Sequence, residues 1–508
     1  MNTDHGPAEA YHWAHTHIRN QLSAHFLDFA NYPKPVKEYD KGIGQQCQLP
    51  EPYNFFNSSS ELNRDTSIVD VISRALYLAY GVTAARKASG ISFFQRSLPS
   101  AGGLYPCHLY LAACPSLFPE TDTHETGLYY FDPVNHILVK TGSGPFLNSP
   151  GLLFIITAAF YNSAWKYRGR AYRYLLLDSG HLIQNIGLAL KIAGMDYGMD
   201  LDFDDTKISA LLNLDNKMEV PLACVAAGWN KSVPEMSDNT QILSHSQFDK
   251  FESRSQELQY MQHYNTLIQA YEAGSNIKSS WPDSLPGDLH VTDSPALNTI
   301  TITDAGSGDT SPNKNMFQNQ PRYDLENLIL RRRSRRNFAK EHVASNQYLE
   351  LVSWVRQGIW EKNKFSADRF LRMGMICQNL EGLDDGFYLF NTPLTKASLL
   401  HSGNLASDLA KVCLDQAWIA RAAMTFLFLS DLKELEDQFG SRGYRYMMTG
   451  AGRLAHQIYL GAEHLGFGCC GIGAIYDMEA KELLNLRAHS ALVYAVSAGP
   501  LKAGTKIE

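Results

Sequence analysis

One long segment of the chain occurs twice. RAYRYLLLDSGHLIQNIGLALKIAGMDYG (170–198) corresponds to RGYRYMMTGAGRLAHQIYLGAEHLGFGCC (442–470), and each residue of the second segment lies 272 positions after its counterpart. Both segments have the apolar spacing of a long helix, and each helical pattern ends at a glycine, Gly194 or Gly466. The repeat therefore predicts two copies of the same long helix.

The same offset continues beyond the helix. ALLNL (210–214) corresponds to ELLNL (482–486), and each is followed by an apolar run of strand length, VPLACVAAG or ALVYAVSAG. A long helix, a second helix and a β-strand are thus written twice. Two copies of one α+β domain are the simplest fold for such a chain.

A polar stretch separates the two copies. Residues 244–273 are polar with helical spacing, and residues 274–320 are rich in Ser, Asp, Asn, Thr, Pro and Gly, which favours an exposed linker with little core of its own. We place the boundaries near residues 240 and 320. The predicted organisation is a first domain at 1–240, a linker at 241–320 and a second domain at 321–508.

Charge and hydropathy exclude several classes of protein. The formal net charge is -7 and the pI about 6.2, which argues against a nucleic-acid partner. The longest apolar run, GLLFIITAAFY (151–161), is about half of a membrane span, and the N-terminus lacks the basic and apolar regions of a signal peptide, so we expect a cytoplasmic protein without a membrane segment. The cysteines form no CxxC pair and show no zinc-ligand spacing, so the cysteine pattern predicts neither a disulfide framework nor a metal site.

An arginine cluster stands out in this acidic chain. In LRRRSRRNF (330–338), arginines fill five of six consecutive positions. Guanidinium groups near a turn can hold a phosphate through paired hydrogen bonds, and Ser334 adds a hydroxyl. The plainer interpretation is a solvated helix end.

Two glycine-rich segments favour a ligand site. RSLPSAGGLYPCHLYLAA (96–113) is a turn of small residues that leads into an alternating strand, and its backbone could approach a flat or phosphorylated ligand. GFGCCGIGAIYD (466–477) follows the second long helix and lacks the context of a dinucleotide-binding fingerprint. Taken singly, each is also consistent with an ordinary loop or helix cap.

Together these segments resemble the nitroreductase superfamily of flavin enzymes, and most closely its SagB/ThcOx-type branch of azoline-peptide dehydrogenases. The resemblance implies an α+β nitroreductase-like fold, FMN as cofactor, and a flavin that lies between two subunits. Here the two copies would form the pair as an intramolecular pseudo-dimer. The residues that carry the resemblance are RRSRRNF (332–338), PSAGGLYP (99–106), YRYLLLDSGHLIQN (172–185), YRYMMTGAGRLAHQ (444–457) and CGIGA (470–474).

The resemblance also assigns candidate FMN-binding residues. The phosphate and the N1/O2 edge of the flavin would contact side chains of the arginine cluster, namely Arg332, Arg333, Ser334 and Arg336. The N5/O4 edge would face the backbone of Gly471, Ile472 and Gly473, and a covering loop from the other copy would supply Pro99, Ser100, Ala101 and Gly102. Lys502, just after the last strand, is a further candidate phosphate ligand.

Each copy has lost half of a site. The first copy offers NSSSELNRDTSIVDVI (57–72) and MDLDF (199–203) where the arginine cluster and CGIGA should lie, and the second has DRFLRMGMICQNL (368–380) in place of the covering loop. These losses are complementary. We therefore expect one composite site per chain and a non-functional twin.

A candidate acid/base pair follows the same division. The SagB-type resemblance points to a Lys-Tyr dipeptide shortly before the repeated helix, and the first copy has Lys166 and Tyr167 where the second has Gln438 and Phe439. A lysine with a lowered pKa, or a tyrosinate, could remove a Cα proton during azoline oxidation. The alternative is an exposed lysine beside a half-buried tyrosine. We expect Asp178 and His181 to form a local structural pair on their helix.

The expected function is that of an FMN-dependent oxidoreductase of the nitroreductase family, which oxidises an azoline heterocycle or a peptide-like molecule by proton abstraction and hydride transfer to flavin N5. An NAD(P)H-dependent nitro or quinone reductase is one alternative. A non-catalytic flavin-binding or scaffold protein is another. The expected partner is a small-molecule or peptide-like substrate, and a homo-oligomer beyond the internal pseudo-dimer stays open.

Overall fold

The structure is a computed structural model of the 508-residue chain. It describes residues 5–22, 26–38, 46–51, 67–88, 90–114, 126–228, 244–245, 254–275, 290–302, 322–359, 371–392 and 394–504. The expected domain boundaries near 240 and 320, and most of the 57–72 segment, lie outside the described residues.

The first copy is built on an antiparallel sheet. Its strand order is β1-β6-β5-β4-β7-β9-β8, with the short β10 paired to β6. In that order the strands are β1 (Gln46–Gln48), β6 (Ile137–Gly144), β5 (Thr126–Asp132), β4 (Cys107–Cys114), β7 (Gly151–Ala159), β9 (Glu219–Gly228) and β8 (Asp196–Asp200), with β10 at Ser244–His245.

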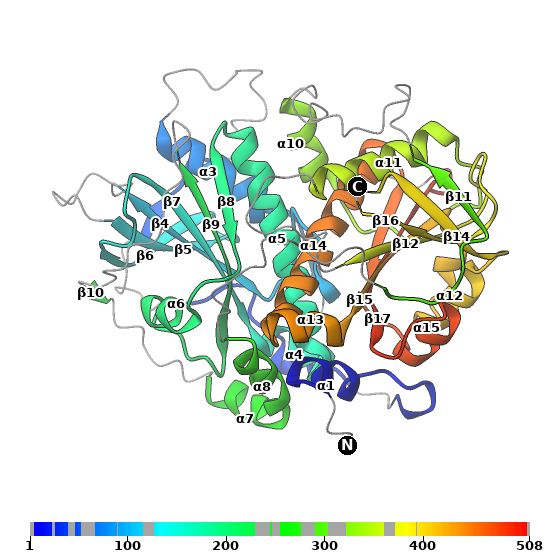
Figure 1. Cartoon of the computed structure of the whole chain (residues 1–508). Helices are drawn as coiled ribbons and strands as arrows, with labels where there is room; N and C mark the ends of the chain where they lie inside the picture. Colours follow the sequence, from blue (N-terminus) through cyan, green and yellow to red (C-terminus); the bar gives the residue numbers. More distant parts are fainter. Residues whose placement is uncertain are drawn as a thin grey trace.

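The second copy repeats this topology. Its order is β11-β14-β13-β12-β15-β17-β16, which matches the first sheet strand for strand, so the predicted duplication of one α+β domain is confirmed (Figure 1). The strands are β11 (Asn298–Thr301), β14 (Lys396–Ser402), β13 (Gly386–Phe390), β12 (Arg372–Cys377), β15 (Met424–Asp431), β17 (Ser490–Gly499) and β16 (Gly468–Ile472).

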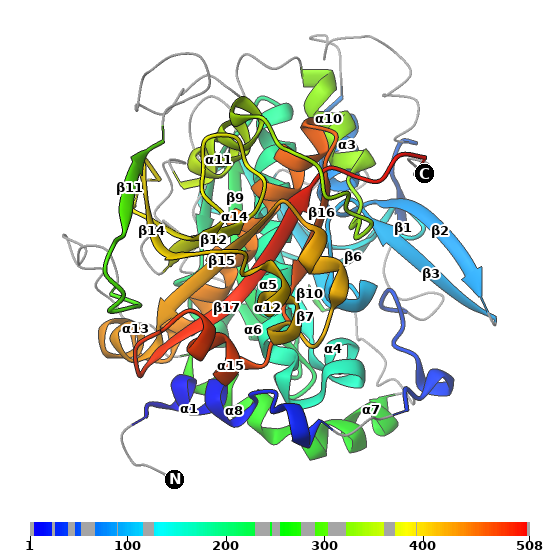
Figure 2. The same cartoon turned by 90° about the vertical axis from the view of Figure 1, so that its right-hand side faces the viewer.

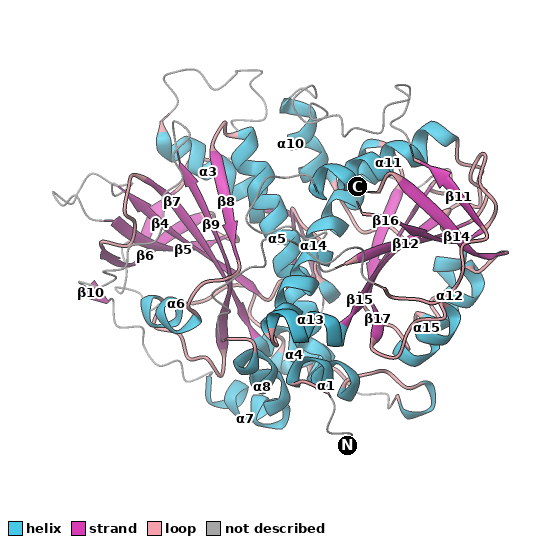
Figure 3. Ribbon diagram, viewed as in Figure 1, coloured by secondary structure: helices cyan, strands magenta, loops and turns pink. Residues whose placement is uncertain are grey.

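The two repeated helices form the centre of the molecule. α5 (Ala171–Ile192) and α14 (Arg442–His464) pack against each other between the sheets, and nearly every residue of both is buried (Figure 3). They cross where Gly180 meets Gly452, because a Cβ atom on either glycine would overlap a backbone carbonyl oxygen of the other helix. Gly180 and Gly452 are themselves counterparts at the offset of 272. The crossing therefore lies on a pseudo-twofold axis that relates the copies.

Buried ion pairs follow the same symmetry. Arg170 and Arg173 of the first copy each place a guanidinium nitrogen 2.7 Å from Asp477 of the second. Arg442 and Arg445 of the second copy bind Asp205 of the first in the same manner, with 2.8 Å between Arg445 and the carboxylate. Reciprocal contacts of this kind are the pattern of a twofold dimer interface. The duplication thus reproduces a dimer within one chain.

The other helices cover the sheets and the central pair. α3 (Ile68–Tyr80) packs on α5, and α11 (Ser345–Ile359) packs on α14. A capping box at Ser67 and Asp70 begins α3. The other helices within the two copies are α4 (Phe160–Tyr167), α6 (Asp205–Leu211), α10 (Arg322–Arg331), α12 (Ala406–Val412), α13 (Leu432–Phe439) and α15 (Asp477–Leu483).

Segments outside the repeats tie the copies together. The N-terminal helix α1 (Pro7–Ala14) lies beside α7 (Arg254–Met261) and α8 (Asn265–Ala273) along one edge of the molecule, and a hairpin of β2 (Val82–Ala88) and β3 (Ile91–Arg96) projects from the body (Figure 2). The predicted linker supplies α8, which packs on α1 and α5, and β11, an edge strand of the second sheet. Among the described residues no helix is long and apolar enough to cross a membrane.

Candidate functional site

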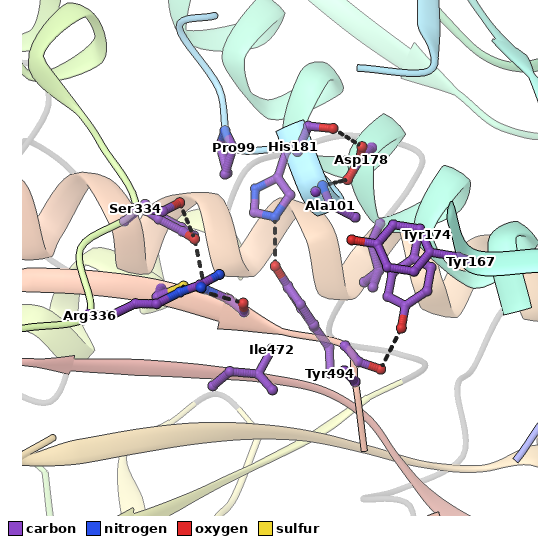
Figure 4. Close-up of a pocket in the computed structure, with 18 of the residues that line it drawn as sticks. Pro99, Ala101, Tyr167, Tyr174, Asp178, His181, Ser334, Arg336, Ile472 and Tyr494 are labelled. Atoms are coloured by element: carbon purple, nitrogen blue, oxygen red, sulfur yellow. Dashed lines mark hydrogen bonds between the residues drawn. The ribbon is translucent and has the colours of Figure 1, made fainter. Parts of the chain in front are cut away.

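A pocket of about 190 Å³ lies on the seam between the copies (Figure 4). Both copies line it. The first contributes Pro99, Ser100, Ala101, Gly102, Tyr167, Tyr174, Leu177, Asp178 and His181, and the second contributes Ser334, Arg336, Gln416, Tyr459, Cys470, Gly471, Ile472, Gly473, Ala474 and Tyr494. The structure thus brings together the covering loop, the glycine-rich segment, Tyr167, Ser334 and Arg336.

The covering loop is held by a buried carboxylate. Asp178 on α5 accepts hydrogen bonds from the Ser100 hydroxyl and from the Ala101 N–H, the latter at 3.1 Å. The Ser100 hydroxyl in turn accepts from the Tyr105 N–H at 2.9 Å. Gly102 has a φ of +65°, a conformation that glycine adopts without strain. In the second copy the counterpart of Asp178 is Gly450. That copy therefore lacks both the loop and its anchor.

Asp178 is an ionisable side chain in a buried position, which is unusual. It is 4% exposed, and burial raises its pKa from 3.8 to about 7, although hydrogen bonds from Ser100 and Ala101 oppose the rise. Asp178 and His181 do not bond to each other, since Asp178 binds the loop and His181 Nε2 lies 3.2 Å from the Tyr494 hydroxyl oxygen. The expectation of a local structural pair is wrong because both side chains reach across to other elements.

Lys166 and Tyr167 end α4 next to this loop. A Cβ atom on Gly102 would lie 2.7 Å from the Tyr167 hydroxyl oxygen and 3.0 Å from Lys166 Nζ. Burial and the nearby positive charge of Arg336 lower the pKa of Lys166. Burial raises the pKa of Tyr167 well above its usual value, which disfavours a tyrosinate. Of the two, Lys166 is therefore the group whose proton is more easily released at neutral pH.

The glycine-rich segment forms β16 and one wall of the pocket. Gly471 has no room for a side chain, because a Cβ atom would overlap the Tyr494 hydroxyl. Its N–H donates to the Tyr459 hydroxyl at 2.7 Å, so this donor is already used within the protein. The Gly473 carbonyl accepts from the Tyr174 hydroxyl at 3.1 Å. The small residues keep the space in front of the strand open.

The arginines of the cluster divide into two groups. Arg336 lines the pocket, where its Nε–H donates to Cys470 Sγ at 3.3 Å, and the Ser334 hydroxyl lies 3.0 Å from that of Tyr459. Arg332 is instead 3% exposed, and its guanidinium donates to the carbonyls of Ser97 and Arg96 at 3.1 and 3.2 Å. Arg332 thus joins the second copy to the first beside the pocket.

Two other candidate phosphate ligands also lie outside the pocket lining. The Arg333 guanidinium donates to the carbonyls of Leu330 and Arg332 at 2.9 Å and to that of Thr83 at 3.3 Å. Lys502 is exposed, and its backbone N–H donates to the Asn337 carbonyl. Backbone carbonyls left without partners at the ends of strands and helices explain why arginines of the cluster turn away from the pocket.

Several residues that line the pocket were not indicated by any sequence motif. Tyr459 and Tyr494 come from the second copy, and their counterparts in the first are Gly187 and Ala223. His181 lies on the repeated helix, and burial lowers its pKa to about 3, so the ring is neutral. A comparison of the two repeats position by position is the signal that could have found the two tyrosines, because such differences mark where one copy has specialised.

The pocket fits a flavin in its chemistry. Arg336 and Ser334 offer donors to an anionic edge, Tyr167 and Tyr174 offer flat aromatic surfaces, and the glycines of β16 leave room for a planar ring. His181 Nδ1 is buried and has no hydrogen-bond partner. An orphaned polar atom in a pocket is expected where a ligand completes the hydrogen bonding.

The corresponding position in the first copy, at β8, does not have the open space found at β16. The counterparts of Gly471 and Gly473 are Met199 and Leu201, both buried. The Met199 side chain packs over Gly187, which is the counterpart of Tyr459. Side chains therefore occupy the space that stays open before β16.

Comparison with known proteins gives matches over both copies. The model of the nitroreductase family matches residues 70–229 and 329–499, more than half of the chain. The structure of a nitroreductase-like protein from Anabaena variabilis superimposes with a TM-score of 0.78 and 24% identity, over 98% of this chain and 100% of that one. This similarity shows that the whole two-copy fold recurs elsewhere.

Curated relatives match shorter segments. A nitroreductase-like protein of Methanocaldococcus jannaschii is 25% identical over 190 residues, 36% of this chain and 92% of its own. The Microcin B17-processing protein McbC of Escherichia coli is 25% identical over 144 residues, 25% of this chain and 52% of McbC. The Trifolitoxin-processing protein TfxB of Rhizobium leguminosarum bv. trifolii is 27% identical over 146 residues, 25% of this chain and 37% of TfxB.

The family match in two regions and the repeated α+β topology lead to one conclusion. This chain belongs to the nitroreductase family of oxidoreductases, and its two nitroreductase-like domains pair within one polypeptide.

Proposed function

We propose that the protein is an FMN-dependent dehydrogenase of the SagB type, which oxidises an azoline heterocycle or a peptide-like substrate. The observation that carries the proposal is the position of Lys166, beside Gly102 of the covering loop and in the electrostatic field of Arg336. The similarity to McbC and TfxB, which are processing proteins of microcin B17 and trifolitoxin, supports a peptide-like substrate.

Residues of both copies would hold FMN in the composite pocket. Arg336 and Ser334 would bind its anionic edge, while the loop at Pro99–Gly102 would close over it from the first copy. A cation next to the pyrimidine edge stabilises the reduced, anionic flavin. Bound FMN would supply the hydride acceptor that such an oxidation needs.

Lys166 would act as the proton acceptor. Burial and Arg336 disfavour its ammonium form, which increases the fraction of neutral amine available at neutral pH. The substrate Cα–H proton would pass to the Lys166 amine, and a hydride would leave the adjacent ring carbon, Cβ, for the flavin, so that the Cα–Cβ single bond of the azoline becomes a double bond. Tyr167, as a neutral phenol, would orient the lysine and contact the substrate.

Anaerobic single-turnover kinetics test this proposal. FMN-loaded protein is mixed with a synthetic peptide that contains a thiazoline, and the visible absorbance of the flavin is followed. We expect bleaching that Lys166→Met slows at least about a hundredfold, as for loss of a general base. Lys207→Met, an exposed lysine on α6, is the control and should behave as wild type.

Other outcomes point to the other classes of function. Rapid bleaching by NADPH without bleaching by the thiazoline would favour a nitro or quinone reductase. A flavin that neither reagent reduces would favour a flavin-binding protein without this activity. Equal rates for wild type and Lys166→Met would contradict the role of the lysine.

A further inference from the structure

The N-terminal helix α1 bridges the two copies and contributes no residue to the lining of the pocket described above. Toward the first copy, the Tyr11 hydroxyl donates to the Gly169 carbonyl at 2.8 Å. Toward the second, the N–H groups of Ala8 and Glu9 both donate to the Glu436 carboxylate at 3.0 Å. This position allows a ligand bound at the start of α1 to influence how firmly the copies are joined.

Three metal-ligand side chains meet at this point. Glu9 Oε2 lies 2.9 Å from His5 Nδ1, and Glu9 Oε1 lies 2.7 Å from Nδ1 of His489, which stands in the second copy just before β17. Potential ligand atoms of the three residues all lie within 4.8 Å of one another. His5 lies just before α1 and Glu9 lies in its first turn, so the start of the helix brings both side chains close to His489.

The Glu9 carboxylate is poised for a cation. Its side chain is 1% exposed, lies 2.9 Å from His5 Nδ1 and 2.7 Å from His489 Nδ1, and accepts a hydrogen bond from the Trp13 indole N–H at 3.0 Å. Its Oε2 atom is buried, and its contact with His5 Nδ1 at 2.9 Å is an ion-pair contact that lacks the geometry of a normal hydrogen bond.

The chemistry of the three groups selects the ligand. Two imidazole nitrogens and a carboxylate are a common protein donor set for Zn²⁺, with water in the fourth position of a tetrahedron. The side chains of His5 and His489 are 33% and 30% exposed, which leaves a path for the ion. The Trp13 indole N–H donates to Glu9 Oε1 at 3.0 Å and would orient the carboxylate from behind, as outer hydrogen bonds do in metal sites.

We propose that His5, Glu9 and His489 form a binding site for a divalent transition-metal ion of the zinc type, which fastens α1 to the second copy. The ion would replace the hydrogen bonds that now connect the carboxylate to the two rings and would satisfy Glu9 Oε2. Lys481, packed on Trp13 and bonded to the Ala488 carbonyl, adds positive charge near Glu9 and moderates the affinity. The site is structural and independent of the flavin.

Titration of the full-length, metal-stripped protein with Co²⁺ tests the proposal, because tetrahedral Co²⁺ has strong visible bands that report its ligands. We expect one ion per chain with micromolar affinity, displaced by Zn²⁺, and a rise in Tm when Zn²⁺ is added. His489→Ala and His5→Ala should each weaken binding at least about tenfold and remove the rise in Tm. Both substitutions are at partly exposed side chains, so the variants should fold.

His464→Ala is the matched control, since His464, the last residue of α14, is also partly exposed and lies 3.0 Å from a single carboxylate, that of Glu350. It should bind Co²⁺ as wild type does. No stoichiometric binding at micromolar Co²⁺ or Zn²⁺ would overturn the proposal. Binding that both histidine variants retain would also overturn it, because the ion would then lie elsewhere, for example on cysteine thiols.

Discussion

The buried carboxylate that holds the covering loop should make the protein less stable as the pH rises. Asp178 is 4% exposed, and the hydrogen bonds from Ser100 and Ala101 compensate only part of the cost of burying its charge. Asp178→Asn retains the shape of the side chain and an acceptor oxygen, and it removes the charge. We therefore expect Asp178→Asn to stabilise the fold at alkaline pH.

The magnitude follows from the pKa. Folding raises the pKa of Asp178 from 3.8 to about 7, and each unit corresponds to about 1.4 kcal/mol, which gives about 4 kcal/mol. Because the folded protein holds the proton more tightly, the stabilising contribution is complete below pH 3.8 and is lost as the pH rises to about 7. The difference between wild type and Asp178→Asn should accordingly grow across this window and stay constant above it.

Urea unfolding of the flavin-free proteins between pH 4 and 8.5, followed by tryptophan fluorescence, measures this difference. Subtracting the two free energies of unfolding at each pH cancels the titration of all other groups. Ser100→Ala is an informative companion, since it removes a hydrogen bond that favours the anion and should extend the window to higher pH. A difference that does not change with pH, or an Asp178→Asn variant that is less stable at pH 8, would refute the reasoning.

Three further predictions concern the pocket and the interface. Arg336→Gln should raise the Kd for FMN at least about tenfold in a fluorescence titration, because a charge-assisted contact is lost, whereas Arg331→Gln, at a side chain 60% exposed, should not. Gly452→Ala should lower the free energy of unfolding by about 1–3 kcal/mol in urea, since its Cβ atom would overlap the Leu177 carbonyl on α5, and an unchanged midpoint would contradict the close crossing. Asp477→Asn should cost about 3–5 kcal/mol in the same assay, because Arg170 and Arg173 stay buried without their counter-ion, and a loss below 1 kcal/mol would show that the ion pairs do not secure the copies.

The fold could be predicted largely from the repeat. The offset of 272 aligns α5 with α14 and α6 with α15, an offset of 271 aligns β9 with β17, and the offset of 272 also pairs Gly180 with Gly452 at the crossing. Both repeated helices are buried nearly throughout although they carry polar residues such as Arg173, Asn185 and Arg453, so their apolar spacing alone did not place them between the sheets. The contribution of the linker to the domains was among the features not predicted, because α8 and β11 gain their core from residues far away in sequence.

The site was predicted in part. The motifs named the loop at Pro99–Gly102 and the strand at Gly471–Gly473, which the structure places in one pocket. They did not separate Arg336, which lines the pocket, from Arg332, which binds carbonyls of the first copy. Arginines at neighbouring positions look equivalent in a sequence, and which one turns inward depends on acceptors that tertiary structure supplies. Tyr494 was missed because it lies in an apolar strand whose pattern fits a core residue equally well.

The central claim is that the two copies build one composite flavin site per chain. The most direct measurement is the number of FMN molecules bound per chain in protein reconstituted with excess FMN, determined together with the molecular mass in solution. One FMN per chain, retained by the monomeric species, is the predicted result. Two FMN per chain, or binding that occurs only when two chains associate, would contradict the composite site.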